Sequence, residues 1–141
     1  MSAAEVFLDS NVLVYLFSTD TVKAQRAESV VERGGTVSVQ VLNEFASVGR
    51  RKVRLEFHEI REALRAIRAG CRVVPMDLET HELGLDIAER YGFSVYDGMI
   101  VGAALRAGCR LLFSEDLQHG QKIAEGLVIH NPFRDQGETT V

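Results

Sequence analysis

The stretch "EVFLDSNVLVYLF", residues 5–17, decides how the rest of the chain is interpreted. It begins with a short apolar segment, reaches Asp9, and resumes after Ser10 and Asn11 as a second apolar run. A carboxylate is costly to bury unless it is paired, and a surface carboxylate has no need of apolar residues on both sides. The stretch therefore predicts a strand followed directly by a helix, with Asp9 held rigidly at the joint.

The same alternation of strand and helix continues along the chain. The expected strands cover residues 5–8, 36–41, 71–76, 109–114 and 126–133, and the expected helices cover 11–17, 21–35, 42–52, 55–70, 78–92 and 98–108. Short strands separated by helices long enough for crossovers indicate a parallel sheet covered on both faces. We therefore expect an α/β fold, a three-layer α/β/α sandwich with a central parallel sheet.

Length and composition fit a single soluble domain. The chain has 141 residues, of which 46% are hydrophobic and 26% charged, and we expect one domain over 1–133 with a polar, flexible tail at 134–141. No stretch reaches the roughly 18 continuous apolar residues of a membrane helix, and no signal peptide is evident. A cytoplasmic protein without membrane contact is expected. The two cysteines, Cys71 and Cys109, are interpreted as reduced thiols at strand starts.

The net charge of −4 argues against simple electrostatic binding of nucleic acid. An acidic protein can still handle phosphates if its carboxylates hold divalent cations that supply the positive charge. Four basic residues crowd into "RRKVR", residues 50–54. This run fits a solvated helix end and a substrate contact equally well.

Four acidic residues fall where the predicted strands end or where the following helices begin. Ligands of open parallel sheets bind beyond the carboxyl ends of the strands. Each acid alone also fits a helix cap, a turn or a solvated surface residue, so the combination carries the argument. The four residues are Asp9, Glu44, Asp97 and Asp116.

Such a cluster needs a counter-charge. Two like charges about 4 Å apart repel by about 4 kcal/mol at an effective dielectric near 20, so the group must take up protons or bind cations. Carboxylate oxygens suit Mg²⁺ or Mn²⁺, whereas the absence of clustered His and Cys argues against zinc. A magnesium site keeps several waters, which leaves room for a phosphate oxygen and an attacking water. The pattern thus predicts metal-assisted phosphodiester hydrolysis.

Four segments, "FLDSNVLVYLF", "VSVQVLNEF", "VYDGMIVGAAL" and "LLFSEDLQHG", resemble the acidic motifs of PIN-domain ribonucleases, closest to the VapC-like toxins of type II toxin-antitoxin modules. The resemblance spans residues 6–133. It implies a PIN fold and an Mg²⁺- or Mn²⁺-dependent endoribonuclease that cuts RNA. It also implies a homodimer and an antitoxin protein as partner.

The resemblance also implies roles for single residues. The family's metal ligands and catalytic acids fall on Asp9, Glu44, Asp97 and Asp116, while Asn11 and Ser114 would orient these ligands or a metal-bound water. Gly98 stands where Ala is commoner and would loosen the start of its helix by up to about 1 kcal/mol. Glu115 is expected to face solvent, His119 to be a turn or packing residue, and Tyr96 to lie in the core.

Two other functions remain open from the residues. A phosphatase or phospho-acceptor domain would use Asp9 as its nucleophile. However, a dehalogenase-like phosphatase needs an Asp where Asn11 stands, and a receiver domain needs a lysine that "LLFSED" does not offer. A non-catalytic dimeric binding module would use its acidic edge to dock a basic partner. Such a module should bind no metal through its carboxylates.

Overall fold

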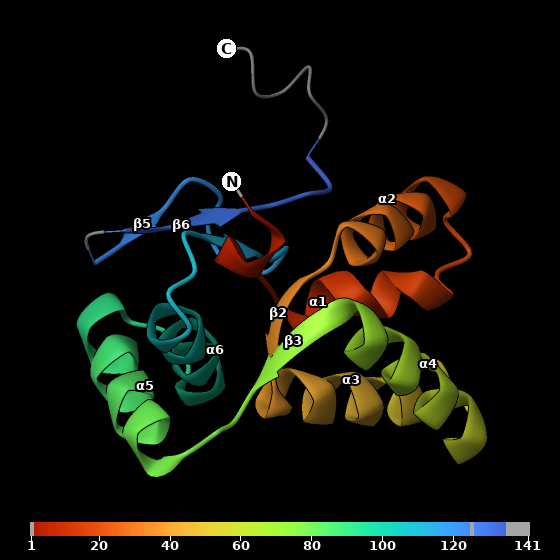
Figure 1. Ribbon diagram of the computed structural model, residues 1–141, viewed down its shortest axis with the longest axis horizontal. Helices are drawn as coiled ribbons and strands as arrows, with labels where there is room; N and C mark the ends of the chain where they lie inside the picture. The colour runs from red at the N-terminus through yellow and green to blue at the C-terminus, as the bar shows by residue number, and fades with distance from the viewer. Residues whose placement is uncertain (1, 125, 135–141) are drawn as a thin grey trace.

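The computed structural model describes residues 2–124 and 126–134, and Figure 1 shows the course of the chain. Strands alternate with helices along most of it. The elements are η1 Ala3–Glu5, β1 Val6–Leu8, α1 Ser10–Leu13, η2 Val14–Phe17, α2 Thr21–Arg33, β2 Gly35–Ser38, α3 Val39–Arg51, α4 Phe57–Gly70, β3 Cys71–Val74, α5 Leu78–Tyr91, α6 Val95–Arg106, β4 Leu111–Phe113, β5 Lys122–Ile123 and β6 Leu127–His130.

The strands form one six-stranded sheet in the order β3-β2-β1-β4-β6-β5. All neighbouring pairs are parallel except β5 with β6, which is antiparallel. β1 lies between β2 and β4, with Phe7 opposite Thr36 on one side and Leu112 on the other. The carboxyl ends of β1, β2, β4 and β6 therefore meet along one edge of the sheet.

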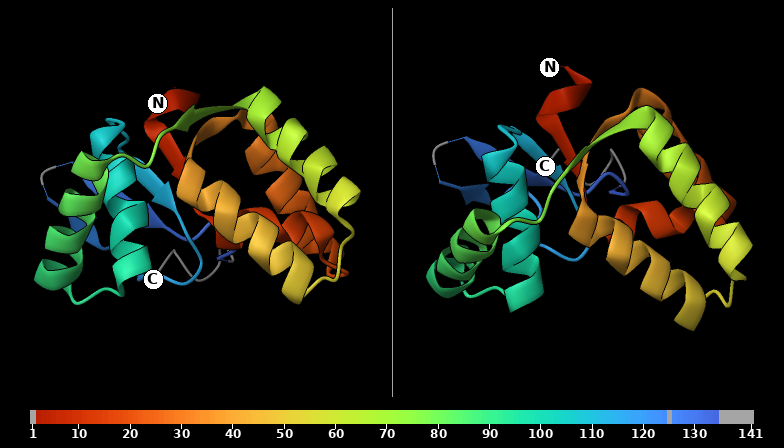
Figure 2. Two further views of the ribbon diagram at one scale, coloured as in Figure 1. Left: turned by 90° about the horizontal axis from the view of Figure 1, so that it is seen from below. Right: turned by 60° about the horizontal axis from the view of Figure 1, so that its bottom comes forward.

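Six α-helices among the described residues flank this sheet. Figure 2 shows α5 and α6 side by side, apart from α3 and α4. Alternate residues of β4 and β6 separate the two faces: Leu112 and Ile129 are fully buried, whereas Phe113 and His130 are only partly buried. The sheet is thus covered more completely on one face than on the other.

The predicted α/β fold with a central parallel sheet is confirmed, although the edge pair of β5 and β6 is antiparallel and several element boundaries differ. The strand expected over 36–41 ends at Ser38, because the Ser38 side chain accepts a hydrogen bond from the Val41 amide and caps α3. The short antiparallel strand β5 was not predicted. Of the polar tail expected over 134–141, only Arg134 lies within the described residues.

The contact between α5 and α6 is made by glycines. A Cβ atom on Gly98 would lie 2.4 Å from the Gly84 carbonyl oxygen and 2.8 Å from the Ala88 Cβ. A Cβ on Gly102 would lie 3.1 Å from the Gly84 backbone. Real Cβ atoms essentially never lie within 3.0 Å of such atoms, so the glycine at position 98 permits this helix packing. The expectation for Gly98 concerned only the stability of the helix start. The structure shows that the residue also lies in the contact between α6 and α5.

Two further features concern the helices and the cysteines. No described helix combines the length and apolar character needed to cross a lipid bilayer. Cys71 and Cys109 are both buried free thiols; Cys71 begins β3, and Cys109 lies two residues before β4. The expected position at a strand start therefore holds for Cys71, whereas Cys109 precedes its strand.

Candidate active site

Asp9 stands at the carboxyl end of β1, in the middle of the sheet. It is the N-cap residue of α1, and its backbone amide donates a 2.9 Å hydrogen bond to the Phe113 carbonyl at the end of β4. Only 4% of Asp9 is exposed. Asp9 is therefore both the cap of a helix and a buried carboxylate. The two interpretations of this residue from the sequence do not exclude each other.

Hydrogen bonds hold the Asp9 carboxylate in one orientation. Oδ1 accepts from the Ser10 amide at 2.7 Å, and Oδ2 accepts from the Ser114 hydroxyl at 2.9 Å and from the Asn11 side-chain amide at 3.3 Å. Asn11 Nδ2 also donates to Ser114 Oγ at 3.2 Å. Asn11 and Ser114, which the resemblance placed around the acids, therefore contact Asp9 directly.

Glu44 and Asp97 approach from the neighbouring helices. Glu44 is partly buried on α3, where Oε2 accepts from Gln40 at 3.3 Å and Oε1 accepts from the Ser10 hydroxyl at 3.4 Å. Asp97 is the third residue of α6, whose N-cap is Ser94, so the helix begins earlier than predicted. The Asp97 amide donates to Ser94 Oγ at 3.1 Å, which leaves the Asp97 side chain free of the capping role.

The electrostatic environment links these acids. Burial raises the pKa of Asp9 to about 7; the hydrogen bonds from Ser114 and Ser10 oppose this shift, and the charges of Glu44 and Asp97 add to it. Burial also raises the pKa of Glu44, and the charge of Asp97 raises it further. The pKa of Asp97 is raised by burial and by the charge of Asp116. Like charges from four segments thus act on one another.

Asp116 lies in the loop after β4 and is exposed. The structure brings Asp9, Glu44 and Asp97 into mutual electrostatic contact and connects Asp116 to them through Asp97. We call these four residues the acidic edge. Within residues 2–124 and 126–134, no three Asp, Glu, His or Cys side chains are arranged so that they could hold a metal ion together.

The donor chemistry of the acidic edge nevertheless fits a hard divalent cation. All four side chains offer carboxylate oxygens, and Asp9 is not paired with any cationic side chain among the described residues. Mg²⁺ usually takes only one or two protein carboxylates and keeps several waters. A closed group of three protein ligands is therefore not required for such an ion.

Sequence reasoning missed a second polar cluster beside the acidic edge. Glu115 accepts hydrogen bonds from the Tyr15 hydroxyl and, at 3.1 Å, from the Lys23 ammonium group. Its backbone amide donates to Asn11 Oδ1 at 3.0 Å. The expectation that Glu115 faces solvent is wrong, because these partners hold it against α2. No spacing in the sequence indicates this pairing.

Three other residues named from the sequence can now be placed. Tyr96 is 67% exposed, so its assignment to the core is wrong. His119 is a packing residue as predicted: its Nδ1 accepts from the Asn131 amide at 3.0 Å, and its ring packs on His130. Arg50, from the basic run, donates to the Leu55 carbonyl at 2.8 Å and lies over the Phe57 ring.

The fold is similar to those of several solved structures. The structure is similar to that of VapC20 from Mycobacterium tuberculosis, described as a Sarcin-Ricin loop cleaving toxin, at 18% identity over 79% of this chain and 89% of that chain, with a TM-score of 0.64. It is also similar to a toxin-antitoxin complex from Klebsiella pneumoniae, at 15% identity over 92% and 99% of the two chains and a TM-score of 0.68.

A third similar structure is the DNA-bound VapBC of Salmonella typhimurium, at 18% identity over 92% and 98% of the two chains, with a TM-score of 0.65. A search of curated protein sequences gave no significant match. The sequence profile of the PIN domain matches residues 6–124, which include all four residues of the acidic edge. The chain therefore belongs to the PIN domain family.

Proposed function

We propose that this chain is an endoribonuclease that hydrolyses RNA phosphodiester bonds with Mg²⁺ or Mn²⁺, and that it is the toxin of a toxin-antitoxin pair. Membership of the PIN domain family and the similarity to VapC20 and to toxin-antitoxin complexes support this proposal. The observation that carries it is the Asp9 carboxylate, whose pKa is raised by burial and, to a smaller extent, by two neighbouring acids, and which no described cation compensates.

The acidic edge would hold the metal through Asp9, Glu44, Asp97 and Asp116. A divalent ion bound there would polarise a phosphate oxygen and lower the pKa of a bound water. The chain's own contribution is orientation. Ser114 and Asn11 fix one oxygen of Asp9, the Ser10 amide fixes the other, and Gln40 and Ser10 fix Glu44.

The expected products are a 5′-phosphate and a 3′-hydroxyl. Water attacks the phosphorus, the bond between phosphorus and the 3′ oxygen breaks, and that oxygen takes up a proton. We further propose an antitoxin protein as partner, a homodimer as the working form and the cytoplasm as the site of action. The toxin-antitoxin complexes among the similar structures support the first of these.

Substitution of Asp9 by Asn tests the proposal. The change keeps the shape of the side chain and removes one ligand charge, so we expect RNA cleavage to fall by about 10²–10³-fold or more. Asp86→Asn is the matched control, because Asp86 is an exposed residue of α5. Purified proteins are incubated with total RNA and Mn²⁺, with and without EDTA, and the product ends are mapped.

Calorimetric titration with Mn²⁺ supplies the independent readout. We expect heat of binding in the wild type and in Asp86→Asn, and none in Asp9→Asn. Cleavage that survives both EDTA and Asp9→Asn would remove the proposed mechanism. Metal binding that does not depend on Asp9 would remove the assignment of the site, and a complete absence of binding and cleavage would favour the docking module.

A further inference from the structure

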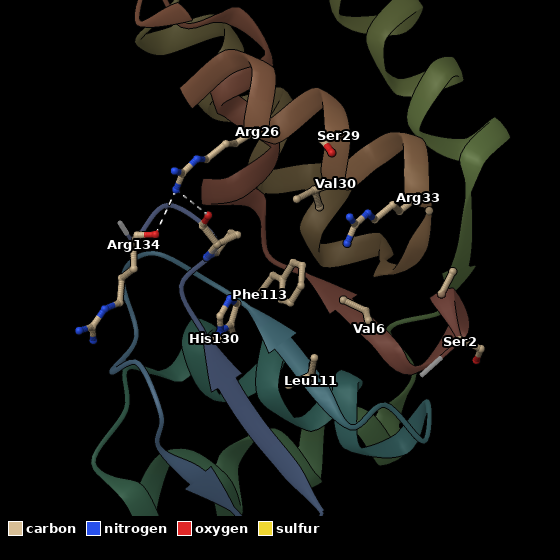
Figure 3. Close-up of a pocket in the computed structure, with 13 residues that line it drawn as sticks. Ser2, Val6, Arg26, Ser29, Val30, Arg33, Leu111, Phe113, His130 and Arg134 are labelled. Atoms are coloured by element: carbon tan, nitrogen blue, oxygen red, sulfur yellow. Dashed lines mark hydrogen bonds between the residues drawn. The ribbon is translucent and has the colours of Figure 1, made fainter. Parts of the chain in front are cut away.

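A groove of about 1040 Å³ lies on the less covered face of the sheet (Figure 3). α2 forms one wall, and the partly buried residues of β1, β4 and β6 form the floor. Figure 3 shows Phe113 and His130 next to each other on this floor, with Leu111 and Val6 further along it. We call this cavity the sheet-face groove. It is not part of the acidic edge.

The α2 wall is basic. Arg26 and Arg33 both line the groove, and they stand seven residues apart, which places them on one side of a helix. The two arginines are about 10 Å apart along the helix axis. Lys23, three residues before Arg26, does not line the groove and forms an ion pair with Glu115. The acidic residues Glu28 and Glu32 line a different cavity, between α2 and α4. The charges of α2 are therefore sorted by face.

The two arginines keep their positive charge for a ligand. Arg26 Nη1 donates to the backbone carbonyls of Pro132 at 3.3 Å and Arg134 at 3.1 Å, which orient the guanidinium without neutralising it. Within the described part of the chain, neither Arg26 nor Arg33 forms an ion pair. In a protein of net charge −4, this is a local excess of positive charge.

The floor adds two rings to this charge. The rings of Phe113 and His130 lie with their centroids 5.3 Å apart, and both side chains are only partly buried. Phe113 directly precedes Ser114, whose hydroxyl donates to Asp9. Phe113 thus connects the ring-bearing end of the groove to the acidic edge, because the next residue along the chain contacts Asp9.

From these observations, and resting on the proposed function, we infer that the sheet-face groove binds single-stranded RNA that flanks the cleaved bond. Arg26 and Arg33 contact its phosphates, and Phe113 and His130 stack on its bases. Stacking on sheet-face rings combined with basic side chains is a general way to hold single strands. An acidic polypeptide would match the arginines but not the two partly buried rings.

Charge reversal at Arg26 and Arg33 tests the inference without requiring cleavage. We compare Arg26→Glu/Arg33→Glu with Arg61→Glu/Arg68→Glu, a control pair with the same spacing and charge change whose members are exposed on α4. The probe is a fluorescein-labelled single-stranded RNA of about 12 nucleotides, and its binding is followed by anisotropy in EDTA. Circular dichroism confirms that both variants fold.

The expected result is a loss of affinity in the groove variant only. Loss of two phosphate contacts should weaken binding about tenfold or more near 0.1 M salt and reduce the slope of log Kd against log salt by about 1.4. Phe113→Leu should weaken binding without changing that slope, because it removes stacking and no charge. Equal losses in the groove and control variants would overturn the inference.

A second probe, poly-L-glutamate, decides between RNA and an acidic polypeptide. If the groove variant loses binding of poly-L-glutamate but keeps full binding of RNA, the inference is wrong and the groove is a protein-docking site. Failure of the proposed function is distinguishable from this outcome. It would appear as unchanged cleavage in Asp9→Asn, whereas the groove measurement is made in EDTA and involves no residue of the acidic edge.

Discussion

Two neighbouring residues of α6 belong to opposite kinds of environment. Gly98 faces α5, where the backbone atoms are as close as packing allows. Asp97, one residue earlier, faces the acidic edge, where burial and the charge of Asp116 raise the pKa of its carboxyl group. At Gly98 the two helices pack without space for another atom, whereas at Asp97 negative charges lie near one another without a compensating cation among the described residues. A rigid helix contact beside the acids can hold them in place although they repel one another.

The largest expected effect concerns the charge at Asp9. Its folded-state pKa of about 7 lies above the ordinary value of 3.8, so the folded state binds this proton more tightly than the unfolded state does. The resulting contribution to the stability of the fold is complete below pH 3.8 and is lost as the pH rises through 7. In metal-free protein, this group should lower the free energy of unfolding by about 4 kcal/mol between these limits. Asp9→Asn should therefore be more stable than the wild type above pH 7, although it is inactive.

Urea unfolding in EDTA between pH 4 and pH 8 measures this difference. The stability gap between Asp9→Asn and the wild type should widen as the pH rises, and Asp86→Asn should follow the wild type at every pH. A gap that stays constant would show that Asp9 is not a source of unrelieved charge. The contrast with the α5–α6 contact would then disappear.

The second prediction reverses the sign expected from helix propensity. Gly98→Ala would place a methyl group against the Gly84 carbonyl and Ala88, so it should destabilise the protein by about 3 kcal/mol. Gly70→Ala is the control, because Gly70 ends α4 and its Cβ would meet only the Val31 carbonyl oxygen, at 3.5 Å. Propensity alone should make that variant neutral or up to about 1 kcal/mol more stable. Thermal unfolding of both variants would expose an error if they shifted in the same direction.

A third variant weakens the support of Asp9 itself. Ser114→Ala removes the hydroxyl that donates to Asp9 and accepts from the Leu117 amide at 3.4 Å. We expect a loss of about 2 kcal/mol at neutral pH and a further rise in the pKa of Asp9, because that hydrogen bond lowers it. The midpoint of the pH dependence of stability should move upward. Ser47→Ala, an exposed position on α3, should leave that midpoint unchanged.

The smallest effect is expected for the ion pair between Lys23 and Glu115. The Lys23 side chain is 36% exposed, so Lys23→Met should change the free energy of unfolding by less than about 1 kcal/mol, with a smaller change at high salt. Chemical denaturation at two salt concentrations measures this. A loss of several kcal/mol would mean that this pair stabilises the loop that carries Asp116, which would make the acidic edge better supported than described above.

The sequence predicted the order of strands and helices because each strand is apolar and most helices have recognisable ends. The helix expected over 78–92 is α5, which Asp77 caps at its start and Gly92 ends in the left-handed conformation at φ 72°. The position of Asp9 was predictable because it directly follows an apolar strand and directly precedes a helix. The end of β2 was not, because "TVSVQV" suits both a strand and a helix, and only the Ser38 cap divides them.

Contacts between distant segments could not be predicted from one sequence. Helix propensity identifies Gly98 as a weak helix former, but its packing against Gly84 depends on how α5 and α6 meet. Glu115 finds Tyr15 and Lys23 only after β4 has paired with β1. The groove beside α2 could be predicted only if it were known which face of the sheet the helices leave less covered. Pattern and spacing describe elements, whereas these features belong to their assembly.

The central position of β1 has a consequence for the newborn protein. Asp9 is made early, together with Ser10 and Asn11, but the carbonyl that accepts from its amide and the hydroxyl that donates to its carboxylate belong to Phe113 and Ser114, near the other end of the described fold. A nascent chain that has not yet delivered β4 to its place beside β1 has no formed acidic edge. If the chain cuts RNA as proposed, it is harmless to the message being translated until most of its own synthesis is finished.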